Sequence, residues 1–533
     1  MMLKQCSHIW KNATIKKYNI VIKRNASFIV GQVHLKQFNS NIQLHRNFKT
    51  KSQTLSTVAY HLQKNRHQIR CITSNNTVNN TNPFRSKSVA SNYENMETKW
   101  RDDPVITTLD TPQFKAMLRK NILDLVALFQ KYNYEIRIAG GAVRDLLMNI
   151  TPIDIDFATT ATPKEMIEMF TKENIRMVNS NGEKHGTITN RINDEENFEV
   201  TTLRIDVHTD GRHAEVEFTT DWLLDASRRD LTINSMYLGF DGKVYDYFFG
   251  YEDLENRRVV FVGEPANRIK EDYLRILRYF RFYGRISDIP DNFDAKTIDA
   301  ICENIDGLQK ISGERIWTEL KKILQGNYRM ELFIKLIECG AGRYIGFPAS
   351  VDCNDLFCLK QTLETTFKDV AINPVTILST LLNSREDALC LHSRLKLSAY
   401  ERDMAFFLAQ NKAVTRGIDE LLYYQKMCLP QKNRSFKLLK DFVLELLKYN
   451  DKRHIYDELL EWEQPKFPIN GTILTECGYS GRKMGAILEK LRDIWADSNF
   501  QMSQEELLQQ HLTPVQQKVA EEESLRKKVK TKK

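Results

Sequence analysis

Apolar side chains recur at helical spacing in residues 112–131. Positions three and four apart lie on one face of an α-helix, so this spacing predicts an amphipathic helix with a buried apolar stripe. We expect the stripe to pack against a neighbouring sheet or helix, because a single helix cannot bury it alone. The stripe consists of Phe114, Met117, Leu118, Ile122, Leu125, Val126 and Phe129.

Short apolar runs with strand character follow this helix and alternate with helical patterns. Such an alternation predicts a small α+β domain with a mixed or antiparallel sheet. The predicted strands are 135–141, 153–158, 186–192, 198–205 and 214–220, with a short strand pair near 244–248, and the predicted helices are 142–148 and 163–173.

The pattern changes to mainly helical in the second half of the chain. Residues 265–285 combine arginines with apolar residues three apart and predict one Arg-rich amphipathic helix. We therefore expect a strand-containing head followed by all-helical regions. The expected parts are a head at 110–240, a neck at 241–350, a body and tail at 351–513 and a charged C-terminal tail at 514–533.

Charge is distributed unevenly along the 533 residues. The chain has a net charge of +8, but residues 1–93 contain no Asp or Glu, and the first acidic residue is Glu94. A basic segment rich in Asn and Ser is typical of a mitochondrial transit peptide, here joined to a disordered linker. We expect a protein of the mitochondrial matrix, and Met96 could start a second, nuclear or cytosolic form.

Two classes of protein are disfavoured by composition. No stretch approaches the roughly 18–20 apolar residues of a membrane helix, so we expect a soluble protein without a membrane partner. The nine cysteines are scattered and lack zinc-finger spacing, which favours neither a structural metal nor a disulfide framework.

A pair of glycines precedes a pair of aspartates in the predicted head. Gly140 and Gly141 stand where a strand runs into a helix, and their lack of side chains allows phosphate oxygens to approach backbone N–H groups. Arg144 follows within the helix, within reach of phosphate. Asp154 and Asp156 alternate on a strand and would share one face. Two neighbouring carboxylates repel each other unless a cation lies between them, so the sequence predicts a Mg²⁺ and triphosphate site.

A third carboxylate is expected in such a site. Glu199 alternates on a predicted strand and is the first candidate, with Glu215 and Glu217 as competitors. In two-metal catalysis, one ion activates the attacking hydroxyl and the other stabilises the leaving group.

A second group of charges lies further along the chain. Asp272, Arg275 and Arg278 are three residues apart and would project from one side of the predicted helix. An intrahelical ladder of ion pairs would explain the same spacing, at only a few tenths of a kcal/mol per pair.

The motifs in residues 110–330 resemble the class II tRNA nucleotidyltransferases, the CCA-adding enzymes of the DNA polymerase β superfamily. The stretch that begins at Gly140 and runs through Asp156 resembles their catalytic motif. The resemblance implies a polymerase β-like head and transfer of nucleotides from CTP and ATP to the 3′ end of tRNA. The helical body would then bind tRNA by its backbone and shape.

The resemblance also implies roles for individual residues. The motif at 228–234 resembles a family motif that contacts ribose and triphosphate, and 271–278 resembles a motif that selects the base. Asp272 and Arg275 would pair with the amine and the ring nitrogen that cytosine and adenine share. The implied contacts to ribose and triphosphate are Arg229, Asp230, Asn234, Arg278 and Arg281.

Two alternative functions remain open on the sequence. A poly(A) polymerase of the same superfamily would carry the same motifs. A catalytically inactive RNA-binding protein could retain the scaffold, although intact Asp154, Asp156 and Asp272 argue against it.

Overall fold

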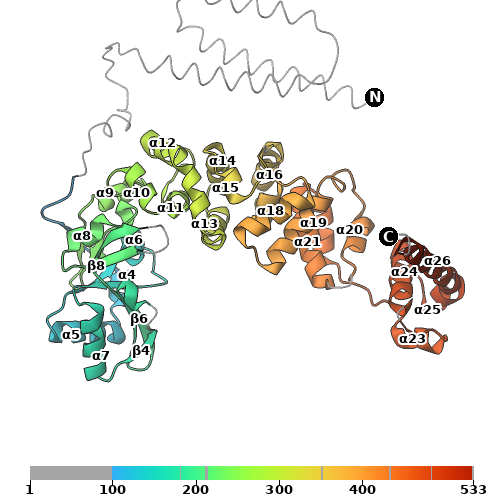
Figure 1. Cartoon of the computed structure of the whole chain (residues 1–533), viewed down its shortest axis with the longest axis horizontal. Helices are drawn as coiled ribbons and strands as arrows, with labels where there is room; N and C mark the ends of the chain where they lie inside the picture. The colour runs from blue at the N-terminus through green and yellow to red at the C-terminus, as the bar shows by residue number, and fades with distance from the viewer. Residues whose placement is uncertain are drawn as a thin grey trace, which may run out of the picture. The chain divides into compact units, whose positions relative to one another are not determined.

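The computed structural model describes residues 99–530, except 180–181, 210–213, 350–351, 431–433 and 482. The basic segment 1–93 and Met96 therefore lie outside the described residues. The strand-rich head lies at the N-terminal side of the described chain, and helices follow it (Figure 1).

The head is built on one mixed sheet of eight strands. Their order is β1-β10-β9-β2-β3-β6-β5-β4. The pairing of β3 with β6 is parallel and the others are antiparallel, which confirms the predicted mixed sheet. The strands are β1 (Val105–Thr108), β2 (Ile136–Ala139), β3 (Asp156–Thr159), β4 (Arg176–Asn179), β5 (Thr187–Ile192), β6 (Glu196–Thr202), β9 (Tyr237–Leu238) and β10 (Lys243–Tyr245).

The predicted strand 198–205 is divided between two sheets. Its first part belongs to β6, which ends at Thr202. The chain then enters β7 (Arg204–Thr209), which pairs with β8 (Ala214–Phe218) in a separate two-stranded sheet. Leu203 lies between them, is fully buried, and donates its N–H to the carbonyl of Thr159. The sequence pattern continues across Leu203 because it is apolar, so periodicity alone could not locate the change of sheet.

The predicted helix 112–131 is interrupted at its middle. Its residues form α4 (Pro112–Met117) and α5 (Lys120–Lys131), since Arg119 adopts an extended conformation. The Arg119 guanidinium donates to Glu196 over 2.9 Å, which ties this break to β6. The apolar stripe is buried as predicted, apart from the half-buried Leu118.

Three further helices pack on the head. α7 (Pro163–Lys172) starts with a capping box in which Thr162 and Glu165 satisfy each other's backbone N–H groups. The others are α6 (Gly141–Leu147) and α8 (Trp222–Ser227), and the short 3₁₀ helix η5 (Thr232–Asn234) precedes β9.

The Arg-rich helix expected at 265–285 is two helices. α10 (Pro265–Glu271) ends at Asp272, whose backbone is extended, and α11 (Leu274–Ile286) begins two residues later. The Asp272 carboxylate accepts the N–H of Leu274 over 3.0 Å, so the side chain stabilises the start of α11. The remaining elements between the head and residue 349 are α9 (Gly250–Glu255), α12 (Ala295–Glu303), η6 (Ile305–Lys310), α13 (Gly313–Gln325), α14 (Arg329–Glu338) and α15 (Gly342–Ile345).

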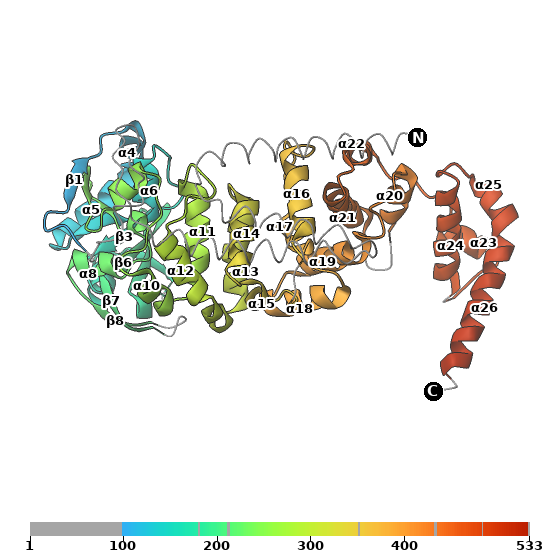
Figure 2. The same ribbon diagram turned by 90° about the horizontal axis from the view of Figure 1, so that it is seen from above.

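Two hydrophobic cores support the rest of the described chain. The larger core runs without interruption from the head to Leu459, and a separate core joins residues between Ile469 and Val519. In this second core α24 and α26 pack side by side (Figure 2). The helices of this part are α16 (Asn354–Glu364), α17 (Pro374–Ser379), α18 (Arg385–Leu395), α19 (Ala399–Asn411), α20 (Leu421–Met427), α21 (Phe436–Tyr449), α22 (Arg453–Glu461), α23 (Gly471–Glu476), α24 (Lys483–Asp497), α25 (Gln504–Glu506), η7 (Leu507–His511) and α26 (Leu512–Lys530).

Within the described residues, no helix is both long and apolar enough to cross a membrane.

The first residue of α13 lies directly against α18. A Cβ built at Gly313 would lie 1.7 Å from the carbonyl oxygen of Arg394. Arg394 in turn donates to the carbonyl oxygens of Tyr344, Leu308 and Ile311 over 2.8–3.0 Å. The contacts around Arg394 therefore join α13 and α18 to the segments of Tyr344 and of Leu308 and Ile311. Because Gly313 faces a backbone oxygen, rotation of a side chain could not make room for a Cβ.

We expect Gly313→Ala to lower the free energy of unfolding by about 1–3 kcal/mol or more, because backbone must move to admit the methyl group. Gly485→Ala in α24 is the matched control, since no atom lies within 4 Å of its built Cβ. The Gly485→Ala substitution should stabilise α24 by about 0.5–1 kcal/mol. Urea denaturation followed by circular dichroism measures both effects, and an unchanged midpoint for Gly313→Ala would contradict the close contact.

Candidate active site

A pocket of about 880 Å³ lies between the head sheet and helices α11 and α13. Its wall combines the start of α6, the start of β3, the segment around η5 and one side of α11. Eleven residues predicted for the site line it: Gly140, Gly141, Arg144, Asp156, Arg229, Asp230, Asn234, Asp272, Arg275, Arg278 and Arg281.

The glycine turn is required by its backbone and by its neighbours. Gly140 has φ of +62°, a conformation that L side chains rarely adopt. A Cβ at this position would lie 3.1 Å from a guanidinium nitrogen of Arg229. The turn thus places Arg229 beside the first residues of α6, where backbone N–H groups have no helical partner.

The two predicted aspartates do not share a strand. Asp156 is the first residue of β3, whereas Asp154 lies in the bend before it, is exposed and does not line the pocket. The prediction of one alternating strand face is therefore wrong for Asp154, because the strand starts two residues later. Desolvation raises the pKa of the Asp156 carboxyl, Arg229 opposes this shift, and repulsion from Asp154 adds to it. The two carboxylates remain close enough to interact.

Glu199 lies directly opposite Asp156 in the parallel pairing of β6 with β3. Its competitors Glu215 and Glu217 lie on β8, in the separate two-stranded sheet. The register therefore places Glu199, and not its competitors, on the strand beside Asp156. No three His, Cys, Asp or Glu side chains of the described residues form a group that could hold a metal ion.

A buried carboxylate orients the arginines that follow α8. Asp225 is 1% exposed, and it accepts hydrogen bonds from Arg228 over 2.7 and 2.9 Å and from Arg229 over 3.2 and 3.4 Å. It also accepts the hydroxyl of Tyr237 over 2.5 Å and the backbone N–H of Arg204 over 3.1 Å. Burial alone would raise the pKa of Asp225, but Arg229 and Arg228 outweigh it and lower the pKa to about 2. The carboxylate is consequently ionised at neutral pH.

A second chain of contacts links head and neck across the pocket. Arg278 on α11 donates to Asp230 over 2.6 Å, and Asn234 donates to the other oxygen of Asp230 over 3.4 Å. Arg144 donates to the side-chain oxygen of Asn234 and also pairs with Asp145 over 2.9 Å. Burial would raise the pKa of Asp230, but Arg278 outweighs it, so the net pKa is lowered.

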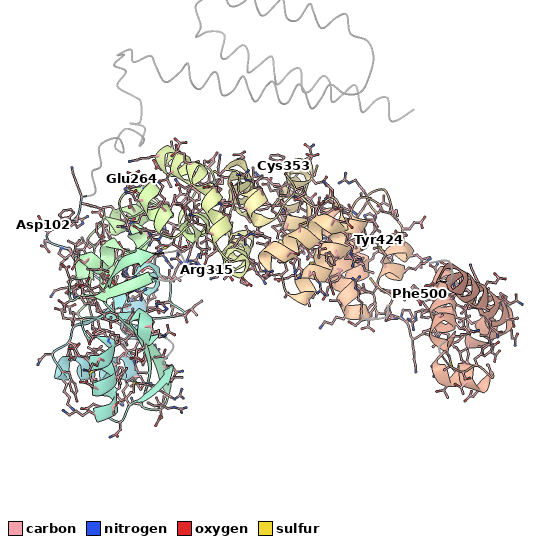
Figure 3. The ribbon with its side chains drawn as sticks, viewed as in Figure 1. Asp102, Glu264, Arg315, Cys353, Tyr424 and Phe500 are labelled. Carbon is pink, nitrogen blue, oxygen red and sulfur yellow. The ribbon has the colours of Figure 1, made fainter. Side chains whose placement is uncertain are left out.

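Asp272 and Arg275 both line the pocket but do not pair with each other. Asp272 precedes α11 and accepts from Arg315 of α13 over 2.8 Å. Arg315 is labelled in Figure 3. Arg275 donates to Glu271 over 2.5 Å and to the carbonyl oxygens of Arg268 and Arg228 over 3.0 and 2.9 Å. The prediction of one continuous helix is therefore wrong, because the helix is broken at Asp272, and the alternative explanation by a ladder of ion pairs does not hold for Asp272 and Arg275. Each group is held by a different partner.

Several lining residues and supporting carboxylates were not predicted. Asp225 stands three and four residues before Arg228 and Arg229, a spacing that brings charges together on a helix and could have indicated the pair. Phe282 could not be recognised as a pocket residue from the sequence, because it fits the apolar spacing of α11. The centre of its ring lies 4.4–5.4 Å from the guanidinium carbons of Arg144, Arg278 and Arg281. The other unpredicted lining residues are Arg204, Asp206, Arg228, Gly284, Arg285, Lys322, Gly326 and Asn327.

Comparison with known proteins agrees with this geometry. Residues 136–260 match the Poly A polymerase head domain, and residues 292–349 match the "Probable RNA and SrmB- binding site of polymerase A". Nine cations and four carboxylates around a pocket beside this head define a nucleotidyltransferase.

Relatives named "CCA tRNA nucleotidyltransferase 1, mitochondrial" from Danio rerio and Homo sapiens are each 49% identical over 405 residues. The match covers 75% of this chain and 92% of each relative. A Thermotoga maritima CCA-adding enzyme solved with tRNA has the same fold, with a TM-score of 0.55 and 20% identity over 78% of this chain and 99% of that one. The chain belongs to the CCA tRNA nucleotidyltransferase family.

We expect Asp225→Asn to destabilise the head in a pH-dependent way. The lowered pKa means that the folded state favours the ionised carboxylate. Its contribution is therefore full above the ordinary value of 3.8 and is lost as the pH falls toward 2. A shift of this size corresponds to about 2 kcal/mol at pH 7.

Urea unfolding of wild type and variant at pH 7, 4 and 3 measures the difference in free energy of unfolding, which should be nearly the same at pH 7 and pH 4 and clearly smaller at pH 3. Asp299→Asn, an exposed residue of α12, should change the free energy by less than about 0.5 kcal/mol. A difference in free energy of unfolding between wild type and Asp225→Asn that grows toward low pH would contradict the lowered pKa of Asp225.

Proposed function

We propose that the protein adds CCA to the 3′ end of tRNA, using CTP and ATP without a nucleic-acid template and releasing pyrophosphate. The observation that carries this proposal is the pocket in which Asp156, Arg229, Asp272 and Arg275 meet, in a chain that belongs to the CCA tRNA nucleotidyltransferase family. Poly(A) synthesis is disfavoured, because the relatives that match most of this chain carry the name of CCA-adding enzymes.

Base selection would rest on Asp272 and Arg275. Cytosine and adenine both present an amine beside a ring nitrogen, which match a carboxylate acceptor and a guanidinium donor. Uracil presents a carbonyl and an N–H in the same places and would leave buried polar groups unpaired. The contacts of Asp272 with Arg315 and of Arg275 with Arg228 hold these two groups in place before the nucleotide arrives.

The triphosphate would lie against the glycine turn and the arginines of the pocket. Gly140 and Gly141 leave room for phosphate oxygens, and Arg144, Arg229, Arg278 and Arg281 supply positive charge along both walls. Asp230 and Asn234 accept hydrogen bonds from Arg278 and Arg144 and so orient them, and they would contact the ribose. The tRNA 3′-hydroxyl would attack the α-phosphorus, and the bond to the pyrophosphate oxygen would break.

Metal dependence is general for the nucleotidyltransferases. We propose that Asp154 and Asp156 hold Mg²⁺. Glu199 on the neighbouring strand is proposed as an additional ligand, although the three carboxylates do not form a metal-binding group in this structure. The donor set suits this ion, because two carboxylates that repel each other gain from a shared cation, and Mg²⁺ often uses only one or two carboxylates plus substrate phosphates. The ion would lower the pKa of the attacking hydroxyl and neutralise charge on the phosphates.

The protein is mitochondrial, like the relatives whose names state it. The acid-free segment 1–93 supports import into the matrix, and Met96 would give a second form without that segment. The helices beyond residue 350 would contact tRNA by its backbone and shape.

A primer-extension assay tests the function. A tRNA that lacks its 3′ CCA is incubated with the protein, Mg²⁺ and each nucleoside triphosphate, and the products are sequenced. We expect two C residues with CTP alone and one further A when ATP is added, with no extension by Asp154→Asn. A long A tract with ATP alone would establish a poly(A) polymerase, and binding without extension would establish an RNA-binding protein.

We expect Asp272→Ala to relax base choice more than it weakens triphosphate binding, since the base is the part of the nucleotide that this carboxylate would contact. The ratio of kcat/KM for CTP to that for UTP should fall by at least about tenfold, which corresponds to about 1.4 kcal/mol of lost discrimination. Single-nucleotide incorporation measures the ratio. Full exclusion of UTP by the variant would contradict the role of Asp272.

A further inference from the structure

The pocket continues along α11 beyond the groups assigned to the nucleotide. Arg275 and Arg285 are ten residues apart on this helix, which is roughly 15 Å along its axis. Past Arg285, the wall is completed by Lys322 of α13 and Asn327 in the turn before α14. A volume of about 880 Å³ is near the upper end of the roughly 300–1,000 Å³ typical of a site for one small molecule. The far end therefore offers room for part of a second substrate.

This far end also carries one cation, Lys322, that no carboxylate of the described residues neutralises, and a second, Arg285, that shares its carboxylate. Lys322 is exposed, and no Asp or Glu of the described chain pairs with it. Arg285 shares Asp145 with Arg144, and its side chain remains 46% exposed. Like Arg285 and Arg144, the remaining arginines of the pocket each have a carboxylate within 4 Å, so Lys322 differs from all of them. The pairs are Arg204–Asp206, Arg228–Asp225, Arg229–Asp225, Arg275–Glu271, Arg278–Asp230 and Arg281–Glu319.

The two cations are held on elements that pack tightly. Gly284, next to Arg285, faces the turn after α13, and a Cβ there would lie 2.8 Å from the carbonyl oxygen of Asn327. α11 and α13 also make one of the most extensive helix–helix contacts of the chain. The backbones that carry Arg285 and Lys322 therefore occupy fixed positions at one end of the pocket, so only the freedom of the side chains is lost when an anion binds.

We propose that Arg285 and Lys322 form a subsite for a backbone phosphate of the tRNA 3′ strand. This inference rests on the proposed function and names one position at which the enzyme holds its polynucleotide. Both substrates must reach Asp156, and the triphosphate already has Arg144, Arg229, Arg278 and Arg281 beside the glycine turn. The strand that ends in the attacking hydroxyl is the second polyanion, and its phosphates would meet the remaining cations.

Lys322→Glu tests the subsite by steady-state kinetics with tRNA lacking CCA. The KM for tRNA should rise about tenfold while the KM for CTP stays unchanged, because only one phosphate contact is lost. The slope of log affinity for tRNA against log salt should fall in magnitude by about 1. Lys164→Glu, the same charge change at an exposed position of α7 that does not line the pocket, should alter neither constant.

Binding of tRNA without nucleotide, measured by gel shift, separates this inference from the proposed function. If wild type binds tRNA but adds no nucleotides, and Lys322→Glu binds about tenfold more weakly, the subsite stands and the function fails. If wild type adds CCA and Lys322→Glu binds and reacts like wild type, the subsite is wrong. A rise in the KM for CTP alone would also overturn it, since Lys322 would then hold the triphosphate.

Discussion

The buried carboxylate of Asp225 is the contact on which the catalytic side of the pocket depends. It lies at the end of α8, accepts hydrogen bonds from two consecutive arginines and a tyrosine, and also holds the backbone of β7 through Arg204. A buried anion is unfavourable unless cations and donors surround it, and here four groups do so. Because Arg229 in turn lies against Gly140, one ionised carboxylate positions both the arginines and the glycine turn.

The same principle extends across the pocket as a series of paired charges. Asp230 holds Arg278, Asp145 holds Arg144 and Arg285, and Glu319 holds Arg281. These carboxylates fix the arginines that line the pocket in place. Such preorganisation would avoid the cost of rearranging charges when an anionic substrate binds. The stability of the head and the proposed binding of the triphosphate would therefore depend on the same ion pairs.

Sequence patterns predicted the mixed sheet, the apolar stripe of α4 and α5 and most of the residues that line the pocket. The patterns failed where the backbone changes direction at a single residue whose polarity still fits the pattern on both sides. Leu203 separates two sheets, Arg119 separates two helices, and Asp272 ends one helix and starts the next. These breaks depend on contacts with distant residues, such as Arg119 with Glu196 and Asp272 with Arg315, which spacing along the chain cannot reveal. Lys322 was missed for the same reason, since it joins the pocket only when α13 packs on α11.

The bond from Arg275 to the carbonyl oxygen of Arg228 joins the helix that we propose to select the base to the segment whose arginines we propose to bind phosphate. In that reaction, a guanidinium that reads one edge of a base would be fixed to the peptide beside the charges that hold the other end of the same nucleotide. Accuracy and rate of transfer would then depend on the same contact. A disturbance that tilts the arginines of the head by a fraction of an ångström would appear as misincorporated nucleotides as well as slower transfer.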